Sequence, residues 1–326
     1  MKLLDRVRET MRRRHMAERT EQAYVSWIVR YIRFHKLRHP ADMGQEEITE
    51  FLSWLATDRK VSASTQNQAL NAIAFLYLKV LGQEIGDIEA IRARRTRRLP
   101  VVLSPEEVAR VLAHLDGQPS LAAQLMYGCG LRVAEACEIR VQNLDLDRGQ
   151  VVVRSGKGDR DRVVMLPRAA RPQLEAQLQR RRHVHERDLA EGGGNAPVPA
   201  AYARKSPTAP TSLGWQFLFM ARAPIPDPER GGAVFRPPIH RTTVQRAIKQ
   251  AGHNALLQKR ITSHSLRHSF ATHLLESGVD IRTVQKLLGH RSVQTTMIYL
   301  HVAEQNFPGI TSPLDRIRSP TPPRTT

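Results

Sequence analysis

Cysteine is scarce in this sequence, which has only Cys129 and Cys137 among its 326 residues. A secreted protein of this length would more often carry several disulfide bonds, so we interpret both cysteines as buried apolar residues in a reducing compartment. No stretch approaches the roughly 18 apolar residues that span a membrane. No apolar segment follows the first charged residues, so no signal peptide is expected. These absences favour a cytoplasmic protein without a membrane partner.

Acidic residues are also few. The chain has 31 Asp and Glu against 50 Lys and Arg, a formal net charge of +19. This excess is large for an enzyme of small molecules and favours a polyanionic partner. The alternative is a protein that is basic for no specific reason, with many arginines. The length is sufficient for two domains, each with its own core.

The first 90 residues have the pattern of a small all-helical domain. Amphipathic periodicity predicts helices over residues 2–13, from Thr20 to about 36, over 45–56, and from Ser62 or Ser64 to Leu81. The exposed arginines and lysines of this domain either grip a DNA backbone or form an ordinary solvated face, and periodicity does not distinguish the two.

A basic linker is predicted over residues 91–103. Five like charges within seven residues repel one another unless an anion lies alongside. We therefore interpret this segment as a linker that lies on DNA, the alternative being a solvated linker. Its arginines are Arg92, Arg94, Arg95, Arg97 and Arg98.

A second domain is predicted over residues 104–320. Helices are expected over 105–115 and 120–128, a hairpin with strands at 151–153 and 163–165, and a charged helix over 171–190. The stretch 192–214 is rich in Gly, Pro, Ser and Ala and interrupts the domain, so we expect an insertion over about 193–219. Asp280 should cap a helix that ends at Gly289, and Ser292 should open the next helix.

Six residues of the second domain have side chains suited to an anionic substrate: Arg132, Lys157, His264, Arg267, His290 and Tyr299. Alone, each has an ordinary explanation, such as a helix face, an exposed turn or a core tyrosine. Together they suit phosphoryl transfer through a protein nucleophile. A tyrosine can attack phosphorus, two arginines can hold the nonbridging oxygens, and a lysine can protonate the leaving 5′ oxygen. Histidines can relay protons, and two arginines can neutralise charge without a metal.

The motifs GLRVAE, SGKGDRDR, HSLRHSFATHLLESG, VQKLLGH and TTMIYLHV resemble, in order and spacing, those of the tyrosine recombinase (phage integrase) family. The resemblance implies a mostly α fold with a small β-sheet: a SAM-like helical core-binding domain and an α+β catalytic domain clamped around DNA. It implies that the six residues are catalytic, with Tyr299 as the nucleophile, and that Glu135 braces the active-site arginine. It also implies a 3′-phosphotyrosyl intermediate, no cofactor and a homotetramer on two recombination sites, with residues 304–315 docking into a neighbour.

The N-terminal segments and the insertion are most similar to those of integron integrases. This resemblance implies integration and excision of gene cassettes and a grip on extrahelical bases of folded single-stranded hairpins. Trp215 and Phe219 suit base stacking there, the alternative being a place in the core. Arg160 stands where a second lysine is frequent, and residues 236–239 replace a more basic run, which puts local DNA contacts there in question.

Three other functions share some of these sequence features. His264 and His268 have the spacing of metal ligands, but no HExxH motif is present and Arg267 lies between them, so we interpret His268 and His273 as structural residues. A DNA-binding protein without catalysis would have no use for Tyr299 and Lys157 together. A phage-type or Xer-like recombinase would keep the chemistry and differ in its DNA sites.

Overall fold

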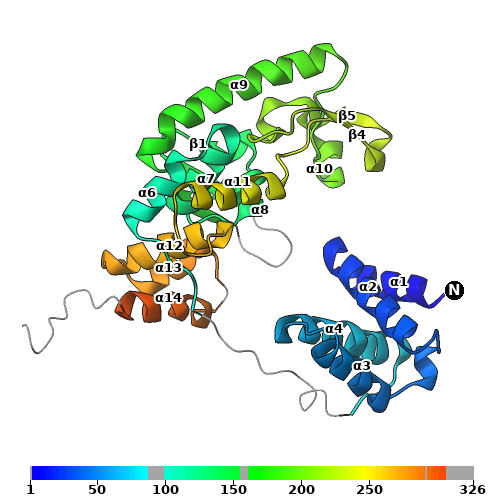
Figure 1. Cartoon of the computed structure of the whole chain (residues 1–326). Helices are drawn as coiled ribbons and strands as arrows, with labels where there is room; N and C mark the ends of the chain where they lie inside the picture. Colours follow the sequence, from blue (N-terminus) through cyan, green and yellow to red (C-terminus); the bar gives the residue numbers. More distant parts are fainter. Residues whose placement is uncertain (1, 87–98, 155–160, 291, 306–326) are drawn as a thin grey trace, which may run out of the picture. The chain divides into compact units, whose positions relative to one another are not determined.

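The computed structural model describes residues 2–86, 99–154, 161–290 and 292–305. The chain divides into two compact units, Met1–Arg98 and Leu99–Thr326 (Figure 1). Helices dominate both units and the described sheets are small and antiparallel, as the sequence predicts. The five linker arginines, Lys157 and Arg160 lie outside the described residues, as does nearly all of 304–315. Within the described ranges, no helix combines the length and the apolar character needed to cross a membrane.

The first unit consists of helices around an aromatic core. Its elements are α1 (Leu3–Arg13), α2 (Glu18–Phe34), the 3-10 turn η1 (Pro40–Asp42), α3 (Gln45–Thr57), α4 (Ala63–Phe75) and the π-helical turn η2 (Leu76–Leu81). The buried hydroxyl groups of Tyr31 and Tyr77 lie 2.9 Å apart, and Phe51 packs edge-on against Tyr31. Helix α2 begins two residues before the predicted Thr20. Its N-cap residue makes no side-chain hydrogen bond, so the sequence carries no capping signal at the observed start.

The second unit is built on helices, most of which share one large core. They are α6 (Pro105–Ala113), α7 (Gly117–Gly128), α8 (Val133–Cys137), α11 (Arg241–Asn254), α12 (Ser263–Glu276), α13 (Ile281–Leu288) and α14 (Gln294–Gln305). Leu125, Ile248 and Leu266 from α7, α11 and α12 are fully buried in it. Cys129 and Cys137 are free and buried as predicted, and burial raises the pKa of each thiol to about 12.

The predicted start and stop signals of the last helices are confirmed. The carboxylate of Asp280 accepts hydrogen bonds from the backbone N–H groups of Arg282 and Thr283, at 2.9 and 3.0 Å. Gly289 ends α13 in the left-handed conformation, with φ of 65°. The hydroxyl of Ser292 accepts the Gln294 N–H just before α14. These turns place residue 290 and α14 beside α12, against which both α13 and α14 pack.

A three-stranded antiparallel sheet is formed by β1 (Leu144–Asp145), β2 (Gln150–Val153) and β3 (Arg162–Met165). The two predicted strands, 151–153 and 163–165, pair as a hairpin, with Val152 opposite Val163. Side chains alternate along β3, so Arg162 and Val164 are buried while Val163 and Met165 are exposed. The alternation therefore turns a charged residue, Arg162, toward the interior.

The predicted charged helix is α9 (Arg171–Ala190), and the insertion that follows is more ordered than its composition indicates. It contains α10 (Ala200–Lys205) and is followed by a hairpin of β4 (Ile225–Asp227) and β5 (Ala233–Phe235), and these elements gather at the C-terminal end of α9 (Figure 1). The remaining short 3-10 turns of the unit are η3 (Val141–Asn143), η4 (Arg168–Ala170), η5 (Ala209–Thr211), η6 (Leu213–Trp215) and η7 (Pro228–Arg230).

A buried polar network ties the insertion and the segment after it to α9. The guanidinium of Arg236 donates two hydrogen bonds to Asp188, at 2.8 and 2.6 Å, and both side chains are almost fully buried. Arg181 is also buried; it donates to the Gln216 amide oxygen at 2.7 Å and lies 3.8 Å from Asp188. The guanidinium of Arg236 is thus neutralised inside the protein. The only basic side chain of residues 236–239 is therefore not available to DNA.

Candidate active site

One carboxylate, Glu135 of α8, organises three arginines. Arg132 at the N-cap of α8 donates its backbone N–H and its guanidinium to Glu135, at 2.7 and 2.6 Å. Arg162 from β3 donates two further hydrogen bonds, at 3.0 and 2.7 Å, and Arg267 from α12 lies 3.6 Å from the same carboxylate. Burial alone would raise the pKa of Glu135, but the hydrogen bonds and charge of Arg162, with those of its other partners, lower it to about 2. The carboxylate is therefore charged at neutral pH.

Arg267 is held at several points. Its two terminal nitrogens donate to the carbonyl oxygens of Gly130 and Leu288, each at 2.6 Å, and the second also lies 3.2 Å from His290 Nε2. Burial lowers the pKa of Arg267 to about 10, so the guanidinium remains a cation at neutral pH. Gly130 has φ of 65°, and a Cβ there would lie 2.5 Å from the Phe270 ring, so this approach requires glycine.

Tyr299 of α14 lies against two histidine rings. Its hydroxyl is 2.9 Å from His268 Nδ1, and its ring is nearly parallel to that of His290, with centroids 6.2 Å apart. The side chain is buried, at 5% exposed. Burial raises the pKa of Tyr299 and the positive charges of Arg267 and Arg132 act against this rise, with a net increase. The phenol is therefore protonated at neutral pH, and attack requires a group that takes its proton.

His290 links Tyr299 to Arg267. Its Nδ1 lies 2.9 Å from the buried Thr296 hydroxyl, and its Nε2 meets Arg267. Burial, together with the charges of the three arginines, lowers its pKa to about 4, so the ring is neutral at neutral pH. His264 is exposed and its ring centroid lies 6.1 Å from that of His268.

The structure brings together most of the predicted catalytic residues. The five that it describes are Arg132, His264, Arg267, His290 and Tyr299. It also places two residues among them that the sequence did not single out for this site, Arg162 and His268. Sequence reasoning missed Arg162, although a charged residue at an inward position of an alternating strand signals a buried ionic partner. It also assigned His268 a structural role, whereas the ring contacts the Tyr299 hydroxyl. His273 does have a structural contact, 3.0 Å from the Tyr127 hydroxyl. Among the described residues, no three His, Cys, Asp or Glu side chains are placed to hold a metal ion.

The two aromatic residues predicted to bind DNA differ in exposure. Phe219 is fully buried in the main core, so the prediction that it stacks on bases is wrong and the core alternative holds. Trp215 is half-buried between the Arg140 guanidinium and the Tyr202 ring, each 5.1 Å from its ring centroid. Tyr202 itself is 47% exposed.

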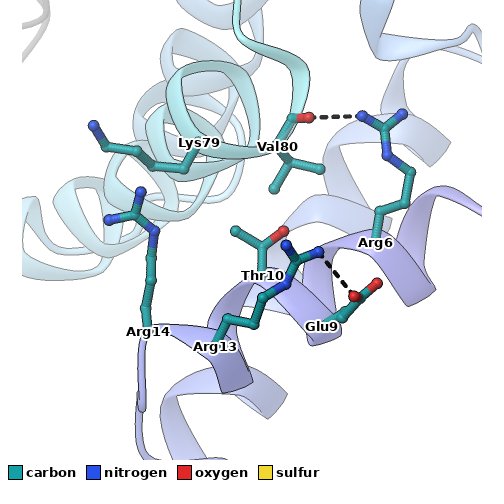
Figure 2. Close-up of a pocket in the computed structure, with 7 residues that line it drawn as sticks. All are labelled: Arg6, Glu9, Thr10, Arg13, Arg14, Lys79 and Val80. Carbon is teal, nitrogen blue, oxygen red and sulfur yellow. Dashed lines mark hydrogen bonds and ion pairs between the residues drawn. The ribbon is translucent and has the colours of Figure 1, made fainter.

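A second basic site lies in the first unit. A surface pocket of about 470 Å³ lies between α1 and η2. Figure 2 shows the side chains that line it. Its lining residues are Arg6, Glu9, Thr10, Arg13, Arg14, Lys79 and Val80. Arg6 donates to the Val80 carbonyl at 2.8 Å, and Arg13 pairs with Glu9 at 2.8 Å. Four cations against one carboxylate give the pocket a net positive charge.

Comparison with known proteins places this site in a family. Residues 101–306 match the phage integrase family, and residues 3–87 match the phage integrase N-terminal SAM-like domain. An "integrase/recombinase" of Escherichia coli is 49% identical, covering 97% of this chain and 94% of its own. The tyrosine recombinase XerA of Thermococcus kodakarensis is 32% identical over 88% of this chain and 86% of its own. A lambda integrase tetramer solved on a Holliday junction has the same fold, with a TM-score of 0.61 and 18% identity, covering 91% of this chain and 76% of that chain.

The chain belongs to the phage integrase family of tyrosine recombinases. It is a tyrosine-type site-specific DNA recombinase, an enzyme that breaks and rejoins DNA. Membership of this family decides against the alternative of a DNA-binding protein without catalysis.

Proposed function

We propose that Tyr299 is the nucleophile of this recombinase and that Arg132, Lys157, His264, Arg267 and His290 are its catalytic partners. The observation that carries the proposal is the set of side chains gathered around the buried phenol of Tyr299 on α14. Arg267 comes from α12 and His290 from the turn after α13. A structural tyrosine has no need of a constrained guanidinium and two histidine rings packed around it.

The proposed reaction follows from the charges of the site. Arg132 and Arg267 bind the nonbridging oxygens of the scissile phosphate and stabilise the charge that develops on them. Their common ion pair with Glu135, itself held by Arg162, keeps both guanidinium groups in place before DNA arrives. The preorganised arginines therefore need little rearrangement in the transition state.

Tyr299 Oη attacks phosphorus and forms a 3′-phosphotyrosyl bond while the bond to the 5′ oxygen breaks. Lys157 protonates that oxygen, a role proposed from its place in the SGKGDRDR motif. The 5′ hydroxyl of a partner strand then attacks the phosphotyrosyl phosphorus, gives its proton to the now neutral Lys157 and releases Tyr299. Each step exchanges one phosphoester for another, so bond energy is conserved and no nucleotide cofactor is consumed.

DNA is the proposed partner of both units. The pocket around Arg13, Arg14 and Lys79 suits a backbone phosphate. The linker arginines Arg92, Arg94, Arg95, Arg97 and Arg98 are proposed to lie along the same DNA. The tetramer of the related lambda integrase on a Holliday junction supports a tetramer of this chain. Four protomers would act on two sites, and residues 304–315 are proposed, from the family resemblance, to dock into a neighbouring protomer.

The finer proposal is an integron-type recombinase that integrates and excises gene cassettes at folded single-stranded hairpins. It rests on the motif resemblance and is supported by the insertion, where Trp215 backs an exposed Tyr202 ring. A half-exposed aromatic pair beside Arg140 suits stacking on an unpaired base. A phage-type or Xer-like recombinase is the alternative, and it would have no preference for hairpins.

The test uses a suicide DNA substrate nicked near the cleavage position, with EDTA present, followed by denaturing electrophoresis. Wild type should give a covalent protein–DNA band that Tyr299→Phe does not give, on duplex or on a hairpin. A covalent band from Tyr299→Phe would show that another residue is the nucleophile.

Hairpin preference is a separate readout. A Tyr202→Ala, Trp215→Ala double variant should lose the preference for hairpin over duplex and retain cleavage of duplex. Equal cleavage of both substrates by wild type would reject the integron assignment without affecting the assignment of Tyr299.

A further inference from the structure

The immediate partner of the Tyr299 hydroxyl is His268, a residue that the proposed mechanism does not use. His268 follows Arg267 on α12, and its Nδ1 lies 2.9 Å from Tyr299 Oη. The two ring centroids are 5.4 Å apart. Because a phenol is the more acidic and an imidazole the more basic of the two groups, the favoured hydrogen bond runs from O–H to Nδ1.

The neighbouring side chains are poorly suited to accept the proton of Tyr299. Arg267 reaches the hydroxyl, but a guanidinium only donates hydrogen bonds. Both ring nitrogens of His290 are engaged, with Thr296 and with Arg267, and its ring stacks on the phenol rather than pointing at its oxygen. The Glu135 carboxylate is bound by its arginines. Among the described side chains around Tyr299, His268 has the geometry of an acceptor.

We propose that His268 is the general base of the cleavage step, which rests on the proposal that Tyr299 is the nucleophile. As the bond between Tyr299 Oη and phosphorus forms, the Oη–H bond breaks and its proton passes to His268 Nδ1, giving an imidazolium. The bond from phosphorus to the 5′ oxygen breaks in the same step, and Lys157 protonates that oxygen. In rejoining, the imidazolium returns its proton to Oη as Tyr299 leaves.

The electrostatics of the site make this transfer depend on DNA. Burial first, and then the nearby His264 and Arg267, lower the pKa of His268 to about 4, so it is neutral and available as a base at neutral pH. Arg132 and His290 complete the charged and titratable groups around the phenol. A phosphate bound between Arg132 and Arg267 offsets their positive field and raises the proton affinity of His268. The base is therefore strengthened when substrate is in place.

Two substitutions separate the base from a merely structural role. In His268→Asn, the amide oxygen lies near the position of Nδ1 and still accepts a hydrogen bond, but it takes no proton. His268→Leu removes both functions at similar volume. In single-turnover cleavage of the suicide substrate, we expect His268→Leu to be about 100-fold slower and His268→Asn to be about 10-fold slower than wild type. DNA binding, measured by gel shift, should be unchanged in both.

The pH profile is the decisive readout. Without a base, attack requires the phenolate, so the cleavage rate of His268→Leu should rise about tenfold per pH unit between about pH 7 and 9, below the ordinary tyrosine pKa of about 10. Wild type should be flat over this range. A substrate with sulfur at the bridging 5′ position, whose leaving group needs no proton, should rescue Lys157→Ala but not His268→Leu.

The outcomes are distinguishable. Cleavage by both His268 variants at the wild-type rate, or a variant profile parallel to that of wild type, overturns the assignment of the base. If His268→Leu does not fold, as judged by its melting curve, His268→Asn carries the test, and its cleavage at the wild-type rate likewise overturns the assignment. A covalent band from Tyr299→Phe instead rejects the nucleophile itself.

Discussion

Arg162 and Glu135 form a two-point ion pair that joins β3 to α8, with nitrogen–oxygen distances of 3.0 and 2.7 Å. Arg162 Nε also donates to the Leu287 carbonyl at the end of α13, at 2.8 Å. One side chain thus connects the sheet, the helix that carries the Glu135 brace and the helix that precedes His290. This arrangement makes the positions of Arg132 and Arg267, the proposed catalytic arginines, dependent on a residue that does not contact the phenol.

Replacement of Arg162 by leucine should destabilise the protein by about 3 kcal/mol, because it leaves Glu135 buried with fewer partners. Cleavage should fall with it, since Arg132 and Arg267 lose their brace. Urea unfolding and suicide-substrate cleavage measure the two effects. Arg154→Gln is the matched control: its pair with Asp161 in the same hairpin is solvent-exposed, so it should cost less than about 1 kcal/mol. Equal losses in both variants would contradict the assigned role of Arg162.

The Glu135 pair should also shape the acid stability of the protein. A carboxylate whose pKa is lowered on folding contributes stability above its unfolded pKa and loses it as the pH falls through its folded pKa. The fall from 4.5 to about 2 corresponds to roughly 3 kcal/mol, lost between these two pH values. Denaturation curves of wild type and Glu135→Gln should therefore converge as the pH falls through this window. A constant difference would show that the ion pair does not cause the shift.

Gly130→Ala should impair both folding and cleavage. The substitution strains a backbone with φ of 65°, and its Cβ would lie 2.5 Å from the Phe270 ring, beside the carbonyl that holds Arg267. Gly149→Ala is the matched control, because φ is 62° and no atom lies within 4 Å of the added Cβ. Backbone strain alone costs about 1–2 kcal/mol, so the control should show that loss and Gly130→Ala a larger one. The excess in thermal or urea unfolding measures the packing clash.

The buried network of Asp188 should hold the insertion in place. Asp188→Asn leaves Arg236 and Arg181 buried with less compensating charge, and the expected loss is about 3–5 kcal/mol. Limited proteolysis should then cut first within the insertion. Glu175→Gln, which breaks an exposed pair with Arg171 on the same helix, should leave the cleavage pattern unchanged. A wild-type pattern for Asp188→Asn would mean that the insertion is held by its apolar contacts instead.

If the basic pocket of the first unit binds DNA, its contribution should appear in the salt dependence of the DNA affinity. If Arg14 and Lys79 each neutralise one phosphate, Arg14→Ala or Lys79→Ala should reduce the slope of log affinity against log salt by about 1. Arg8→Ala, on α1 but outside the pocket, is the control and should leave the slope unchanged. Identical slopes for all variants would place the DNA elsewhere on this unit.

Local chemistry made much of this protein predictable from its sequence. The limits of α9, the cap at Asp280 and the stop at Gly289 depend on residues within a turn or two, and each was predicted correctly. Runs of valine likewise predicted the two paired strands of the hairpin, 151–153 and 163–165. The motifs also predicted that Arg267, His290 and Tyr299 belong to one site. Where the local signal was weak, as at the start of α2, the prediction missed by two residues.

Only the tertiary structure decided which of these groups touch. Caps and periodicity say which face of an element is buried, but not which distant side chain meets it. Arg162 on Glu135 and His268 on Tyr299 are contacts between separate elements, set by how β3 packs on α13 and α12 on α14. The burial of Phe219 and of Arg236 could not be predicted from the sequence for the same reason. The sequence alone determined the chemical types in the site, and packing determined the hydrogen bonds on which their proposed roles rest.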